Sequence, residues 1–179
     1  MDWKGELAEL RAEKDEWFKS HESPLTDDLR KGFTGLKYWP VSDKFRVKAK
    51  VERLQDAEVI TMEVSRGQQR KMVKAARLSF EVDGKTHSLI GYTQARSHGF
   101  AVHEKLFVPF RDGTSAHGSY GAGRYIDLED PGGAELTLDF NDCYSPYCAY
   151  SDDYSCPLPP RENWLELRVE AGEADLGRH

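Results

Sequence analysis

Hydrophobic positions follow two different periods along the chain, and the change of period separates a helical beginning from a strand-rich remainder. In residues 3–19 apolar side chains recur every three or four positions, which is typical of one face of a helix. That face carries Trp3, Leu7, Leu10 and Trp17, with the stem of Lys14 beside them. Further along, Thr26 and Gly32 are typical of the start and the end of a short second helix.

From residue 45 onward apolar and polar side chains alternate, which is typical of strands with one buried face. Asp83-Gly84 predicts a two-residue hairpin turn, and Pro109 is expected to stop the strand that precedes it. Unpaired sheet edges invite aggregation, so we expect an antiparallel β-barrel or two-layer sandwich with the N-terminal helices packed on it. About eight strands are predicted, near residues 45–51, 60–64, 78–82, 85–92, 106–108, 125–128, 136–140 and 165–170.

Length and charge restrict the class of protein. The 179 residues suffice for one domain, which we divide into a helical segment, 1–33, and a β-rich body, 34–179. A net charge of -6 argues against a general role on nucleic acid, which needs clustered lysine and arginine. The polar N-terminus and the absence of a long apolar run predict no membrane association and a cytoplasmic location.

The segment 141–163 stands out because its composition suits neither helix nor strand. Its residues 144–150 and 156–163 together hold three tyrosines, two cysteines and four prolines. Proline fixes φ and removes a backbone donor, whereas aromatic residues and cysteines argue against disorder. Long ordered loops are often functional, so this segment is a candidate part of a site.

A second unusual segment, residues 109–124, holds glycines at positions 118, 121 and 123. A dinucleotide fingerprint would be followed by a helix, whereas here a strand is predicted. The segment is therefore either an ordinary loop or one side of a binding mouth. In the second case Arg111, Arg124 and Tyr125 would hold an anionic or carbonyl group, because the forked donors of arginine suit such oxygens.

Cys148 and Cys156 have seven residues between them, and three interpretations stay open. They are buried thiols packed as small apolar groups, a disulfide across the loop, or metal ligands. The spacing is wider than that of paired zinc ligands, and no partner pair follows in the sequence. No metal or cofactor is predicted.

Two motifs carry a family resemblance: Cys-Ala-Tyr at residues 148–150 and Cys-Pro-Leu-Pro-Pro at residues 156–160. With them the chain resembles a bacterial and archaeal family known only as domain of unknown function 1684. Further matching segments are residues 13–19, 23–25, 35–40, 106–112, 121–128, 139–163 and 171–173. The resemblance implies a shared β-rich fold and a shared site, with Cys148 and Cys156 in the family pattern and Cys143 outside it. It implies no established activity.

The leading hypothesis is a small-molecule site where the loops 109–124 and 141–163 converge, because function tends to lie on loops held by a rigid scaffold. The candidate ligand-binding residues are Arg111, Tyr120, Arg124, Tyr125, Asn141, Tyr147 and Asn163. If the protein is an enzyme, a cofactor-free hydrolase or isomerase is expected, with the candidate catalytic residues Cys148, Asp127 and Tyr150. The alternatives are a non-catalytic protein-interaction module and a thiol redox or metal-binding protein that uses Cys148 and Cys156.

Overall fold

The computed structural model describes residues 2–55, 58–95, 105–130 and 132–177. The predicted N-terminal helix is present as α1, Trp3–Phe18, and it is capped by the Asp2 carboxylate, which accepts a hydrogen bond from the Gly5 N–H at 2.8 Å. Its buried apolar residues are Leu7 and Phe18, whereas Leu10 is 61% exposed. The second helix, α2, spans Asp27–Lys31 between Thr26 and Gly32, as predicted.

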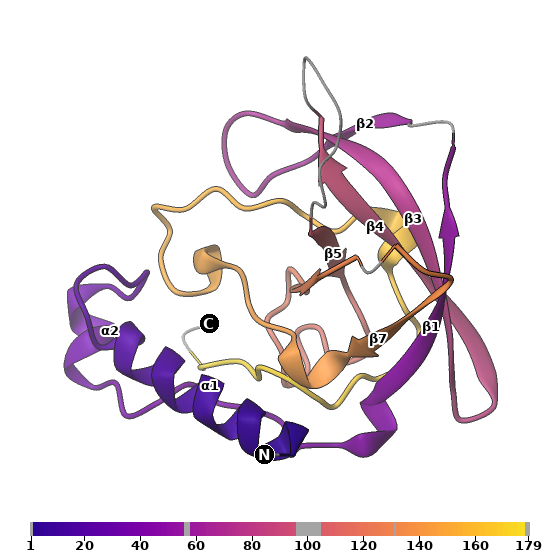
Figure 1. Cartoon of the computed structure of the whole chain (residues 1–179). Helices are drawn as coiled ribbons and strands as arrows, with labels where there is room; N and C mark the ends of the chain where they lie inside the picture. Colours follow the sequence, from indigo (N-terminus) through magenta and orange to yellow (C-terminus); the bar gives the residue numbers. More distant parts are fainter. Residues whose placement is uncertain (1, 56–57, 96–104, 131, 178–179) are drawn as a thin grey trace.

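In the described residues seven strands form one antiparallel sheet, which confirms the mainly β class. The order is β6-β5-β4-β3-β1-β7, and the sheet curls into a half-barrel; β2 lies beside β1 on the same edge of the long strand β3. The strands are β1 (Arg46–Arg53), β2 (Val59–Met62), β3 (Arg70–Val82), β4 (Lys85–Gln94), β5 (Leu106–Phe110), β6 (Arg124–Leu128) and β7 (Glu135–Asp139). Figure 1 shows the curled sheet on one side, the two helices on the other, and the segment after β7 between them.

The hairpin between β3 and β4 turns at Asp83-Gly84, as the sequence predicts. Both residues have positive φ, 53° and 74°, the combination that a tight two-residue hairpin turn requires. Glycine adopts such angles without steric cost, and aspartate is one of the few other residues that tolerate them.

Two expectations about strands were wrong. Strand β5 continues through Pro109, which pairs with Tyr125, and ends at Phe110. Residues 165–170 are not a strand, because their backbone groups bond to a loop and to side chains instead of to a neighbouring strand. The Gly113 N–H donates to the Leu167 carbonyl at 2.9 Å, and the Val169 N–H donates to the Asp112 carboxylate at 2.7 Å.

Two apolar clusters fix the parts that surround the candidate site. The larger one fills the curled sheet with residues such as Leu78, Phe110 and Phe140. A second cluster packs Phe18 of α1 against Ala149 and Tyr150 of the loop 141–163, so this loop is held between the helices and the sheet. No helix in the described residues has the length and apolar character needed to cross a membrane.

Candidate functional site

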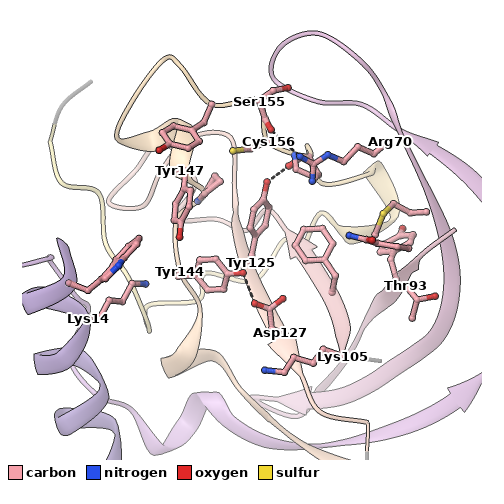
Figure 2. Close-up of a pocket in the computed structure, with 18 of the residues that line it drawn as sticks. Lys14, Arg70, Thr93, Lys105, Tyr125, Asp127, Tyr144, Tyr147, Ser155 and Cys156 are labelled. Carbon is pink, nitrogen blue, oxygen red and sulfur yellow. Dashed lines mark hydrogen bonds between the residues drawn. The ribbon is translucent and has the colours of Figure 1, made fainter. Parts of the chain in front are cut away.

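A cavity of about 660 Å³ lies between α1, the loop 141–163 and the ends of several strands. Helix α1 contributes Lys14 and Trp17, β3 contributes Arg70, and β6 contributes Tyr125 and Asp127. Figure 2 shows these elements around one space, with the side chains of the loop facing those of the sheet. Further lining residues are Phe18, Met72, Tyr92, Thr93, Gln94, Lys105, Phe107, Tyr144, Pro146, Tyr147, Tyr154, Ser155, Cys156 and Pro157.

Strand β6 supplies part of one wall through simple alternation. Successive side chains of a strand point to opposite faces, so Tyr125 and Asp127 point to the cavity whereas Arg124 and Ile126 point to the core. The Tyr125 hydroxyl is fixed by donating to the Pro157 carbonyl, a contact that Figure 2 marks.

Aromatic rings form most of the remaining wall. Phe107 meets Tyr125 edge-on with ring centroids 4.7 Å apart, and Tyr144 meets Tyr125 edge-on at 5.8 Å. At the rim Trp17 stacks on Tyr147 at 6.2 Å, and these two side chains are 36% and 41% exposed. Such walls suit a planar or apolar ligand, because rings bury much area and prefer offset or edge contacts.

The charges around the cavity are unbalanced. Among the described lining residues, the cations are Lys14, Arg70 and Lys105, and the one carboxylate is that of Asp127. Lys14 pairs with Glu173 at 2.8 Å, and Lys105 pairs with Glu129 at 3.2 Å.

Arg70 differs from these lysines. Among the described residues no carboxylate lies within ion-pair distance of its guanidinium, which donates a long hydrogen bond of 3.5 Å to the Ser155 carbonyl. Figure 2 shows Arg70 at the upper rim, near Cys156. The cavity therefore presents a cation with free donors beside aromatic walls, an arrangement that suits an anionic group.

The buried tyrosines of the site stay protonated near neutral pH. Burial, followed by the hydrogen bond to Asp127 at 2.6 Å, raises the pKa of Tyr144 above its ordinary value. Burial also raises the pKa of Tyr125 and of Tyr92. These hydroxyls are therefore hydrogen-bond donors rather than bases.

Beside the cavity Cys148 and Cys156 lie in hydrogen-bonding contact, within one cluster that includes Tyr125. Both are free thiols. The hydrogen bond from Cys156 is the largest influence on Cys148 and lowers its pKa to about 6, while the Tyr120 hydroxyl donates to the same sulfur at 3.6 Å. In contrast, burial raises the pKa of Cys143 to about 11, and that thiol lines no part of this cavity.

Comparison with known proteins places the chain in a family. Residues 31–174 match the family described as protein of unknown function (DUF1684). The chain belongs to the DUF1684 family. It is also similar to an uncharacterised protein of Haloarcula marismortui, solved by solution NMR, with 42% sequence identity and a TM-score of 0.77. That match covers 99% of this chain and 97% of the other, and no curated protein matches.

Four of the residues that the sequence suggested for a site or for thiol chemistry line the cavity of this DUF1684 chain: Tyr125, Asp127, Tyr147 and Cys156. Two more, Tyr120 and Cys148, lie next to it through their contacts with Cys156 and Tyr125. The loops 109–124 and 141–163 were both expected to line the site. Within the described part of the chain, the loop 109–124 contributes no lining residue.

The other suggested residues make internal contacts. Asn141 bonds both the N–H and the carbonyl of Ser42 at 2.9 Å, and Tyr150 donates to the buried Glu173 carboxylate. Arg111 is half-buried against the Trp164 ring at 4.5 Å. Arg124 and Asn163 are almost completely buried in hydrogen-bond networks that are described in the Discussion.

Several lining residues were not predicted from the sequence, among them Trp17, Arg70, Phe107 and Tyr144. Arg70 belongs to the basic run 66–77, which the sequence shows, but its position at a cavity depends on how β3 curls. Within the described residues no group of three or more histidine, cysteine or acidic side chains is placed to share a metal ion.

Proposed function

We propose that this protein binds a small planar molecule with a negative charge in the cavity between α1 and the sheet. The observation that carries the proposal is the Arg70 guanidinium, which has no carboxylate partner among the described residues, beside walls of aromatic rings. A cavity of about 660 Å³ falls in the size range of small-molecule sites, which are mostly apolar with a few polar groups that fix orientation.

The contacts suggest how such a molecule would lie. Its planar part would pack against Tyr125 and Phe107, whose rings already form an edge-to-face pair. Its anionic group would face Arg70 at the rim, because a guanidinium binds carboxylate, sulfonate or phosphate oxygens with two parallel hydrogen bonds. The exposed Asp127, bonded to Tyr144, would accept a donor on the ligand.

Paired probes test the proposal. Anilinonaphthalene sulfonate is planar and anionic, and N-phenylnaphthylamine has the same ring system without the charge. We expect the fluorescence of both to rise on binding, with the sulfonate bound more tightly. Arg70→Gln should weaken sulfonate binding about tenfold, the loss of about 1.4 kcal/mol of a charge-assisted contact, and leave the neutral probe unchanged.

A matched control lies on the same strand. Arg77 of β3 is exposed, pairs with Glu52 and does not line the cavity, so Arg77→Gln should change the affinity of neither probe. Equal loss of sulfonate affinity in both variants would mean that general surface charge, and not the cavity, holds the anion.

A further inference from the structure

Cys148 and Cys156 are held together by two different parts of the fold. Cys148 lies in the short 3-10 helix Tyr147–Ala149, which packs on α1 through Ala149. Cys156 is fixed to the connection after β2: its N–H donates to the Ser65 hydroxyl at 3.0 Å, and its carbonyl accepts from the Ser65 N–H at 2.9 Å. The contact between the thiols is therefore set by the tertiary structure and not by a flexible loop.

The environment of the two sulfur atoms differs. Cys156 lines the cavity, whereas Cys148 lies behind it and does not. Cys148 accepts hydrogen bonds from Cys156, from the Tyr120 hydroxyl and from Ser65, and such donors stabilise a thiolate. The contact that lowers the pKa of Cys148 raises the pKa of Cys156, so the pair gives up its first proton readily and shares the second between the two sulfurs. Of these two sulfurs, Cys156 is the one that faces the cavity.

We propose that Cys148 and Cys156 form a redox-active dithiol that exchanges with a low-molecular-weight disulfide entering the cavity. This activity goes beyond the proposed anion binding and depends on the cavity but not on its charge. The structure assigns Cys156 as the attacking sulfur and Cys148 as its base and then as the resolving thiolate.

The exchange balances as follows, with the small disulfide written RSSR. The proton of Cys156 passes to the Cys148 thiolate as the Cys156 sulfur attacks one sulfur of RSSR. The S–S bond of RSSR breaks and releases RS⁻. This RS⁻ takes the proton from Cys148 and leaves as RSH. The Cys148 thiolate then attacks the Cys156 sulfur of the mixed disulfide and expels the second RS⁻, which is protonated by solvent. The dithiol loses two electrons and RSSR gains them.

Intact-mass measurement with bis(hydroxyethyl) disulfide tests this chemistry, and because that disulfide is neutral, the result is independent of anion binding. The folded protein should lose two hydrogens, and Cys143→Ser should behave in the same way. Cys148→Ser should instead retain one mercaptoethanol adduct, on Cys156, because the resolving thiol is absent. Cys156→Ser should react at least about tenfold more slowly than the unmodified sequence, since no reactive sulfur then faces the cavity.

The pH dependence separates a prepared dithiol from two incidental thiols. With Cys148 as base, the rate should rise as its thiolate forms, near pH 6, and level off by about pH 7.5. In Cys148→Ser the rise should move to the ordinary thiol range, about pH 8–9. The proposal would be overturned if the folded protein did not lose two hydrogens. It would also be overturned if Cys156→Ser gained an adduct on Cys148 while Cys148→Ser gained none on Cys156.

Discussion

Arg124→Met is expected to lower the free energy of unfolding by about 3–5 kcal/mol, the range found when one partner of a buried ion pair is removed. Arg124 and Asp112 are each 1% exposed and lie 3.4 Å apart. The guanidinium also donates to the carbonyls of Ala171 and Glu173, at 2.5 and 3.0 Å, and to that of Val169 at 2.8 Å. Methionine would leave all these acceptors without the donor that joins the C-terminal segment to β6.

Urea unfolding followed by circular dichroism measures this change. Arg77→Met is the control, because Arg77 is exposed and its pair with Glu52 is a surface contact worth less than about 1 kcal/mol. Adding Asp112→Asn to Arg124→Met should recover part of the loss, since it removes the buried charge left without a partner. Equal stabilities of Arg124→Met and Arg77→Met would contradict the internal role of Arg124.

Asn163→Ala is expected to cost about 3 kcal/mol, because it leaves three buried backbone groups unsatisfied. Asn163 accepts from the Ile90 N–H at 2.7 Å and donates to the carbonyls of Ile90 and Pro109, at 2.9 and 2.8 Å. Pro109 has no N–H to offer β4, and β4 and β5 pair only at Tyr92 and Phe107 among the described residues. The amide therefore fills the gap between these two strands.

Asn163→Asp sharpens the test. A carboxylate can accept from Ile90 but cannot donate to the two carbonyls, so it should destabilise the protein as alanine does. Both variants should also speed hydrogen exchange of the Ile90 amide. The control Gln94→Ala, on the exposed end of β4, should change neither the stability nor this exchange rate. Stability within about 0.5 kcal/mol of the unmodified protein would show that the amide is dispensable.

The local features of the fold were readable from the sequence because they depend on neighbouring residues. The helix cap at Thr26 and the Asp83-Gly84 turn act over a few positions, and alternation located most strands. The strand predicted at residues 165–170 was wrong because, among the described residues, no strand lies beside this strand-like pattern. Its partners are the backbone of the loop at Gly113 and the Asp112 and Arg124 side chains, which all lie far away in the sequence.

The site was harder to predict, because residue type does not reveal direction. Arg124 and Tyr125 were both expected at one mouth, although adjacent residues of a strand face opposite sides. Alternation therefore separates them: Tyr125 lines the cavity and Arg124 enters the core. Arg70 was not predicted because the sequence shows it only as an arginine in a basic run. Its place at a cavity depends on α1 and the loop 141–163, which lie beside it in the folded chain.

The most direct test of the proposed binding is an NMR titration of the labelled protein with anilinonaphthalene sulfonate, following backbone amides. We predict that the largest shifts fall on residues that line the cavity, above all Tyr125, Asp127 and Tyr147, with saturation at one probe per protein. Amides of Val169 and Ala171, which are buried beside Arg124, should change little. No saturable shifts, or shifts centred away from the cavity, would contradict the account.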